Sequence, residues 1–360
     1  RQTVAEENDA EQVKTAGNLE VHFIDVGQGD ATLIKCDGHS MLIDAGNNDK
    51  GTLVQNYLQH QGVETLDYVI GTHPDADHIG GMDVVLYKFD CKTIIMPDVA
   101  NNTRTYDDVV QTMKNKGYKT TYPVVGETYT IGGAAFTIIA PNKEYGNDMN
   151  SWSVGVLLQN GNHRFLFTGD AEEGAEQDIL QNGIDISADV YKVAHHGSNT
   201  ATSQAFLDAV HPTYAVISAG EGNSYGHPHA EVLNRLRAAG VSVFRTDEQG
   251  TIVAASDGTT LTWNMSPSES WQAGEAKKSQ DTDKSEKSTD SQNNAETDAA
   301  VSNPTDQTDG NSDVIVHITK TGEKYHSAGC QYLRKSDIEV TLSEAKARGL
   351  TPCSKCNPPQ

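Results

Sequence analysis

The chain has 360 residues, and its 27 Lys and Arg against 50 Asp and Glu give a formal net charge of −23. Such a charge disfavours unaided binding of nucleic acid, whose affinity depends on Lys and Arg contacts to phosphates, although bound divalent cations can offset it locally. The sequence also has no apolar run near the roughly 18 residues that span a bilayer, so we expect no transmembrane segment.

Residues 1–18 form a polar leader that begins at Arg1 rather than at a methionine. We interpret this leader as the start of a trimmed product whose export signal has been removed. The expected location is therefore outside the cell or at its surface.

Residues 19–265 alternate predicted strands and helices. Strands are expected at 19–27, 31–36, 40–46, 66–70, 188–197, 212–220 and 241–247, with a hairpin over 153–170 that turns at Asn160-Gly161. Helices are expected from residue 80 onwards, at 105–117 with a terminal glycine, and at 203–210 and 229–240. Hairpins mixed with strand–helix units predict an α/β sandwich rather than a purely parallel sheet.

The rest of the chain divides into a linker and a small second domain. Residues 266–312 are mostly Ser, Asp, Thr, Asn, Gln and Lys, a composition that predicts a disordered linker. Residues 313–360 regain apolar positions. A piece this short has little core and usually needs a staple such as a metal ion.

The stretch "GTHPDADHIGG" at 71–81 places four possible metal ligands, His73, Asp75, Asp77 and His78, between a predicted strand and a predicted helix. Loops at such positions often carry the chemistry of α/β proteins. Alternate residues of an extended loop share a side. His73 and Asp75 can therefore face one metal ion while Asp77 and His78 face another.

Later strands end in residues of the same kinds: Asp170 in "FTGD", His195 and His196 in "KVAHHGS", and Tyr225 and His227 in "SYGHPH". Two metal ions about 3.5–4 Å apart need a bridging carboxylate, and Asp170 fits that place. One of His195 or His196 completes the second ion, and the sequence leaves open which. Such a centre lowers the pKa of a shared water toward about 7, which gives hydrolysis without a protein nucleophile. The candidates for catalytic residues are Asp77, His227 and Tyr225.

The motifs "THPDADHIGG", "FTGD" and "AHHGS" resemble those of the metallo-β-lactamase superfamily. The wider set adds "FIDVGQGDA" at 23–31, "LIDAG" at 42–46, "NSWSVGVLL" at 150–158 and "ISAGEGNSYGHP" at 217–228. Over nearly all of residues 19–265 this set resembles the hydrolase domain of the ComEC DNA-uptake protein and its secreted relatives. The resemblance implies an αββα sandwich with a dinuclear metal site on one edge and nuclease activity on DNA.

The chain departs from the superfamily pattern at two places. The second His of H-x-H-x-D-H is Asp75, and the segment that usually supplies a further His offers Asn150, Ser151 and Ser153. An oxygen-rich ligand set moves the metal preference from zinc toward manganese or magnesium. We therefore expect two divalent ions, Mn or Zn and possibly Mg. The residues expected to support metal ligands from behind are Asp25, Asp30 and Ser153.

The tail contains a second possible metal site. His326, Cys330, Cys353 and Cys356 have a spacing typical of zinc binding. The pattern resembles the zinc-binding module at the start of the Ada DNA-repair protein, which has Cys where this chain has His326. We therefore expect a structural zinc rather than methyl transfer. Disulfide-like pairs or free thiols are the alternative in an oxidising compartment.

These observations predict a monomeric, metal-dependent phosphodiester hydrolase. The leading hypothesis is an extracellular DNA nuclease with DNA or another phosphodiester polyanion as its substrate. One alternative is a cell-wall phosphodiesterase that acts on a teichoic acid or phosphocholine ester. The other is a non-catalytic binding protein with a degraded metal site.

Overall fold

The computed structural model describes residues 16–274 and, further along the chain, 315–319, 324–326, 333, 338–347, 350–353 and 355. The chain divides into two compact units on either side of residue 282. Most of the predicted leader and linker, together with Cys330 and Cys356, lies outside the described residues.

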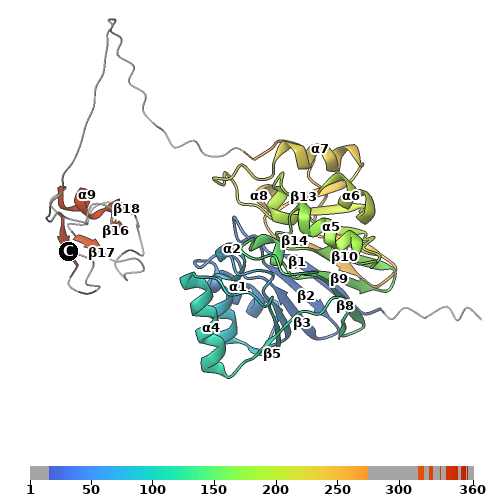
Figure 1. The fold of residues 1–360 in the computed structure, drawn as a ribbon, viewed down its shortest axis with the longest axis horizontal. Helices are drawn as coiled ribbons and strands as arrows, with labels where there is room; N and C mark the ends of the chain where they lie inside the picture. The colour runs from blue at the N-terminus through green and yellow to red at the C-terminus, as the bar shows by residue number, and fades with distance from the viewer. Residues whose placement is uncertain are drawn as a thin grey trace, which may run out of the picture. The chain divides into compact units, whose positions relative to one another are not determined.

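Within the described residues, the first unit contains two sheets that pack face to face (Figure 1). The eight-stranded sheet has the order β15-β14-β1-β2-β3-β4-β5-β6. Its strands are β1 (Leu19–Phe23), β2 (Thr32–Cys36), β3 (His39–Ile43), β4 (Thr65–Ile70), β5 (Asp90–Ile95), β6 (Thr120–Thr121), β14 (Ile252–Ser256) and β15 (Leu261–Trp263). The seven-stranded sheet has the order β13-β12-β11-β10-β9-β8-β7. Its strands are β7 (Thr128–Ile131), β8 (Ala134–Ala140), β9 (Gly155–Asn160), β10 (His163–Phe167), β11 (Val190–Lys192), β12 (Tyr214–Ile217) and β13 (Ser242–Arg245).

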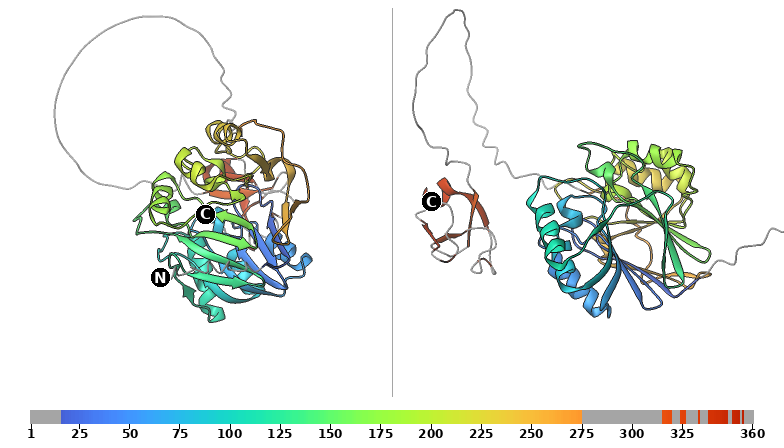
Figure 2. Two further views of the ribbon diagram at one scale, coloured as in Figure 1. Left: turned by 90° about the vertical axis from the view of Figure 1, so that its right-hand side faces the viewer. Right: turned by 60° about the horizontal axis from the view of Figure 1, so that its bottom comes forward.

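Helices cover the outer face of each sheet, as the right-hand view of Figure 2 shows. The helices are α1 (Gly51–His60), α2 (Ala76–Ile79), α3 (Met82–Lys88), α4 (Arg104–Lys116), α5 (Glu173–Gln181), α6 (Gln204–Val210), α7 (Ala230–Ala238) and α8 (Thr246–Gln249), with short 3₁₀ turns at Asn150–Trp152 and Ala194–Gly197. Val54 and Val109 pack against the eight-stranded sheet, while Phe206 and Leu233 pack against the other. The predicted αββα sandwich is confirmed.

Local contacts in the structure explain why single elements could be predicted from the sequence. The side chain of Thr103 accepts a hydrogen bond from the N–H of Tyr106 and begins α4, and Gly117 ends that helix in a left-handed conformation with φ of 72°. The predicted hairpin joins β9 to β10, with Asn160 opposite His163. Both sheets mix parallel and antiparallel neighbours, as the mixture of hairpins and strand–helix units indicates.

The topology brings the polar motifs to one edge. The strands β10, β11 and β12 are parallel neighbours, so their carboxyl ends lie side by side. Asp170 follows β10, His195 and His196 follow β11, and the loop that carries Tyr225 follows β12. The carboxyl end of β4 in the facing sheet leads directly into the loop of His73.

The packed part of the first unit continues beyond the boundary predicted at residue 265. Ser268 donates its backbone N–H to the carbonyl of Val243 at 2.7 Å, and Gly274 donates to the carbonyl of Pro228 at 2.9 Å. Trp271 packs against the helix layer of the seven-stranded sheet. The start of the segment assigned to the linker by composition is therefore held on the domain.

The second unit contains, in its described part, a small sheet with the order β18-β16-β17-β19. Its elements are β16 (Ile315–Ile318), β17 (Lys324–His326), β18 (Ile338–Thr341), α9 (Leu342–Ala347) and β19 (Thr351–Pro352). Val316, Ile318, Tyr325 and Leu342 form its core. Every helix in the described residues of the chain is too short or too polar to cross a bilayer.

Candidate metal centre

The loop after β4 is fixed by close backbone packing. A β-carbon on Gly80 would lie 2.3 Å from the carbonyl oxygen of Ala76, and one on Gly29 would lie 2.4 Å from the carbonyl oxygen of Asp77. Neither position has room for a side chain. The tight approach explains why glycine follows the polar cluster. It also buries His73 and His78 completely.

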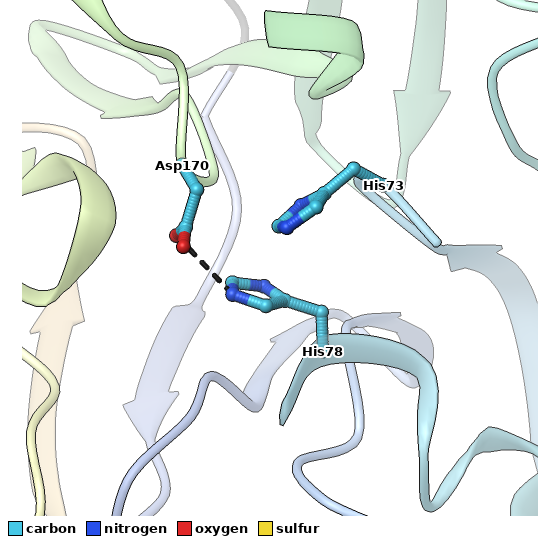
Figure 3. A group of neighbouring side chains, drawn as sticks. All are labelled: His73, His78 and Asp170. Atoms are coloured by element: carbon cyan, nitrogen blue, oxygen red, sulfur yellow. Dashed lines mark ion pairs between the residues drawn. The ribbon is translucent and has the colours of Figure 1, made fainter. Parts of the chain in front are cut away.

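Asp170 lies at the centre of the cluster (Figure 3). One carboxylate oxygen, Oδ1, is 3.2 Å from Nε2 of His78. The other, Oδ2, is 3.5 Å from Nε2 of His196 and 3.6 Å from Nε2 of His195. The carboxylate of Asp77 is 3.3 Å from Nε2 of His196. A single carboxylate therefore faces ligand groups on two sides.

The geometry fits metal ions better than hydrogen bonds. The buried atoms Nε2 of His73, Nε2 of His78, Nε2 of His196 and Oδ1 of Asp170 all lack a hydrogen-bond partner. Buried polar atoms without partners are rare in folded proteins. Two atoms that bind one tetrahedral ion at about 2.1 Å lie about 3.4 Å apart, close to the separations around Asp170. The residues present therefore fit divalent metal ions.

The structure places His195 and His196 in different surroundings, a distinction that the sequence leaves open. His196 is buried, and its Nδ1 donates to the carbonyl oxygen of Ser218 at 2.9 Å, so that Nε2 faces Asp77 and Asp170. This is the usual arrangement of a histidine that binds a metal.

His195 lies on the more open side of the cluster. Its Nδ1 is 3.1 Å from the hydroxyl of Thr200 and 3.5 Å from a carboxylate oxygen of Glu172. Both histidines have left-handed backbones, with φ of 50° and 54°. This rare conformation sends the two neighbouring rings into different surroundings.

Several residues support the cluster from behind. Asp44 lies 2.8 Å from Nδ1 of His78 and also accepts the N–H and the hydroxyl of Thr72. The hydroxyl of Ser153 accepts the backbone N–H of Asp170 at 3.0 Å. The same hydroxyl is 3.3 Å from Nδ1 of His73. Ser153 thus links the backbone of Asp170 to the ring of His73.

A buried ion pair lies behind His196. Asp30 is 3.4 Å from Nδ1 of His196 and 2.9 Å from the ammonium of Lys192. Sequence reasoning missed Asp44, Lys192 and Glu172. Asp44 had a usable signal, because it is the polar residue at the end of the buried strand in "LIDAG".

Asp25 differs from the expectation. Its carboxylate accepts the N–H of Gly27 at 2.9 Å and so closes its own turn. Asp30 and Asp44 make the contacts to histidines that were expected of Asp25.

The residues predicted after β12 lie beside the cluster. The His227 ring centroid is 5.6 Å from that of His195. Nδ1 of His227 is 3.4 Å from the amide nitrogen of Gln28. The ring of Tyr225 stacks on His227 at 5.5 Å.

The protonation states follow from burial and neighbouring charge. Burial and the charge of His78 lower the pKa of His73 to about 3. Burial opposes ionisation of Asp77, but the close contact with His196 and the charge of His78 outweigh it and bring its pKa to about 2. Burial also disfavours the charged form of His78, yet Asp170 and Asp44 raise its pKa well above the usual value. Asp170 and Asp44 thus favour the protonated form of His78. A metal ion that bound His78 would displace that proton.

The cluster opens into a cleft of about 140 Å³. Its lining residues are Gln28, Asp75, Asp77, Asn150, Asp170, His195, His196, Tyr225 and His227. A larger cavity of about 590 Å³ lies between β1, β2 and β14, but its lining includes none of these residues. The smaller cleft is therefore the candidate functional site because several His and Asp side chains converge on it, although it is not the larger cavity.

Part of the predicted tail site lies within the described residues. The parallel pairing of Tyr325 with Pro352 places His326 and Cys353 next to each other on β17 and at the end of β19. Both residues are buried. Cys330 and Cys356 lie outside the described residues.

A two-sheet sandwich with a His/Asp cluster at the shared edge defines a metallohydrolase of the αββα type. The family model of the metallo-beta-lactamase superfamily matches residues 24–221, and the chain belongs to this superfamily.

Two curated relatives bear out the predicted resemblance to competence proteins. ComE operon protein 3 of Bacillus subtilis (strain 168) is 31% identical over 255 residues, which cover 65% of this chain and 32% of that protein. Recombination protein 2 of Haemophilus influenzae is 33% identical over 238 residues, which cover 65% of this chain and 28% of that protein. The chain thus spans about a third of the length of these relatives. Among solved structures, the metallo-beta-lactamase fold protein YhfI from Bacillus subtilis is 13% identical, with a TM-score of 0.45 over 69% of this chain and 100% of that chain.

Proposed function

We propose that the chain is a metal-dependent phosphodiesterase that cuts DNA outside the cell or at its surface. The observation that carries the proposal is the set of buried, unpartnered ligand atoms around Asp170 at the floor of an open cleft. Membership of a hydrolase superfamily supports it. The name of one relative, Recombination protein 2, refers to recombination and supports DNA as the substrate.

We assign the ligands to two ions. His73, Asp75 and Asp170 would hold the first ion, and Asp77, His78, His196 and Asp170 would hold the second. When bound, the two ions would acidify a shared water and polarise a phosphoryl oxygen. Ser153 contacts His73 at the place where the superfamily pattern usually supplies another histidine, so the first site is rich in oxygen. This favours Mn²⁺ or Mg²⁺ over Zn²⁺.

His195 has a different task in this proposal. Its Nε2 faces the cleft beside Asp170, while Nδ1 is oriented by Glu172 and Thr200. Asn150 donates to the same Glu172 oxygen at 3.1 Å and holds that carboxylate in place. His195 can therefore hold a proton at Nε2 and pass it to the leaving oxygen of the ester.

The test compares an isosteric variant of the central ligand with a matched control. Asp170→Asn removes the bridging charge, whereas Asp108→Asn changes a half-exposed carboxylate on α4. Both variants and the parent chain are stripped with a chelator and incubated with single- and double-stranded DNA plus Mn²⁺, Mg²⁺ or Zn²⁺. We expect cutting by the parent and by Asp108→Asn, and neither cutting nor two bound ions in Asp170→Asn.

Other outcomes lead to other functions. Hydrolysis of bis-p-nitrophenyl phosphate without any cutting of DNA would favour the cell-wall phosphodiesterase. No turnover of either substrate, with fewer than two ions bound, would favour the non-catalytic binding protein. All proposed ligands belong to one chain, so we also propose that a monomer is active, which light scattering of the cutting species tests.

We further propose that residues 313–360 form a module with a structural zinc bound by His326, Cys330, Cys353 and Cys356. The adjacent positions of His326 and Cys353 in the small sheet support this. The full chain should hold one tightly bound zinc that survives Asp170→Asn and is lost in Cys353→Ser. Loss of that zinc in Asp170→Asn would assign it to the hydrolase centre instead.

A further inference from the structure

Tyr225 is unusually exposed for a residue of the cleft. It leaves 63% of its surface accessible, although it belongs to the cleft lining. Its ring lies nearly parallel to that of His227, with centroids 5.5 Å apart and an interplanar angle of 18°. The imidazole lies against part of the ring, and most of the tyrosine surface remains open to solvent.

The loop holds this aromatic ring in a fixed place. The side-chain amide of Asn223 donates to the carbonyls of Gly220 and His227 at 2.9 and 2.6 Å. Its oxygen accepts the N–H groups of Tyr225 and His227 at 3.1 and 3.0 Å. An aromatic ring that is fixed in this way with one open face is prepared to stack on a flat partner.

The ring is also close to the proposed chemistry. His227, on which Tyr225 stacks, lies 5.6 Å from the ring of His195 and 6.1 Å from the ring of His196. Tyr225 also lines the same cleft as Asp170 and His195, so a flat group stacked on its open side can belong to the nucleotide whose phosphate enters that cleft.

We propose that Tyr225 is a stacking platform for the nucleobase beside the scissile phosphate, so that the substrate is single-stranded or unpaired nucleic acid. This inference rests on the proposed phosphodiesterase function. Bases within a duplex are already stacked on their neighbours, so an unpaired base is the one that reaches such a ring. A polyol phosphate has no aromatic ring to stack there.

The test uses short single-stranded oligonucleotides that differ by one base. One strand carries all its bases, and the others carry an abasic sugar on either side of the cut position. Stacking on an aromatic side chain contributes about 1–3 kcal/mol per base, so the parent enzyme should prefer the complete strand by about fivefold to a hundredfold in kcat/KM. In Tyr225→Ala this preference should fall to about one.

Two control variants separate the ring from other effects. Tyr225→Phe keeps the ring without the hydroxyl and should keep the preference. Tyr87→Ala changes a tyrosine on α3 that is equally exposed, at 64%, but lies outside the cleft lining, and it should also keep the preference. Metal content is measured in each variant to confirm an intact centre.

Three results overturn the inference. The first is an unchanged preference in Tyr225→Ala. The second is an equal loss of rate on all strands in both Tyr225→Ala and Tyr225→Phe, which would assign the hydroxyl to the reaction itself. The third is a parent enzyme that cuts no strand with any ion, in which case the proposed function itself fails.

Discussion

The ion pair between Lys192 and Asp30 gives the sharpest test of how the centre is built. Only 3% of the Lys192 side chain and 7% of the Asp30 side chain are exposed, and their charged atoms are 2.9 Å apart. Burial opposes ionisation of Asp30, but the positive charges of Lys192 and His196 hold its pKa below the usual value. We expect Lys192→Met, which keeps the length of the side chain, to leave an uncompensated charge behind His196.

The size of the effect follows from the burial. Removing one partner of a buried ion pair costs about 3–5 kcal/mol. At roughly 2–4 °C per kcal/mol for a domain of this size, the melting temperature should fall by about 6–20 °C. Loss of a partner that orients a metal ligand also weakens metal affinity by about 10–100-fold.

The assay combines thermal unfolding in a chelator with a metal competition titration. The double variant Lys192→Met/Asp30→Asn should recover most of the lost stability, because no buried charge is left unpaired. Lys92→Met is the matched control. It breaks an ion pair of 2.7 Å with Asp67 whose lysine side chain is 62% exposed, and it should lower the melting temperature much less than Lys192→Met does, because solvent screens an exposed pair.

The reasoning is refuted if Lys192→Met and Lys92→Met lower the melting temperature equally. It is also refuted if the double variant is no more stable than Lys192→Met, since the cost would then arise from lost packing and not from the unpaired charge of Asp30. If Lys192→Met is less stable but binds metal with unchanged affinity, the Lys192–Asp30 ion pair contributes to folding stability and not to metal binding.

Three further predictions concern the whole centre. Ser153→Ala removes the hydroxyl between Asp170 and His73 and should weaken the first ion about tenfold in a competition titration, with the second ion retained. In the metal-free chain, the raised pKa of His78 gives stability that is present below its unfolded pKa of about 6.5 and is lost as pH rises through the folded value. The lowered pKa of Asp170 gives stability that is present above about 3.9 and is lost as pH falls. Thermal unfolding in a chelator should therefore show maximal stability between about pH 4 and 6.5, and saturating metal should move that maximum upward, because ions compete with protons. Finally, kcat/KM for long DNA at saturating metal should rise as salt is added to about 0.15 M, since screening weakens repulsion by the acidic domain. A steep fall with salt would instead indicate a basic binding surface.

Sequence patterns predicted the elements of the fold because nearby residues determine where such elements begin and end. The helix expected at 105–117 is observed at Arg104–Lys116, where a capping threonine and a terminal glycine define its ends. The strands predicted at 31–36 and 66–70 end at the expected residues, Cys36 and Ile70, but the other predicted strands outside the hairpin are too long at their carboxyl ends. Residues 188–197 contain only three strand residues, Val190–Lys192, because the chain then turns so that His195 and His196 can face the site. The apolar residues of the motif were mistaken for further strand.

The site was predictable in its residue types but not in its contacts. Asp170 and the cluster from His73 to His78 are recognisable because folding alone rarely requires so many Asp and His side chains at the ends of buried strands. The supporting residues depend on neighbours distant in sequence: Asp30 reaches Lys192 across 162 positions, and no local pattern encodes that distance. The same limit applies to Asp25, whose place beside Asp30 in the motif says nothing about which of the two turns inward.

The acidic composition and an anionic substrate are compatible because the charge of the centre depends on its ions. Lys192 offsets Asp30. Without ions, the protonated His78 balances only part of the charge of Asp75, Asp77 and Asp170, so the cleft would stay acidic and repel a phosphodiester. Two divalent ions would make the local charge of the cleft positive. Burial strengthens electrostatic interactions there because the dielectric constant is low. Under the proposed function, a phosphodiester would therefore be attracted to the loaded centre, although the chain as a whole has a net charge of −23. Such an arrangement would give weak general affinity for polyanions and confine binding to the place where the proposed reaction occurs.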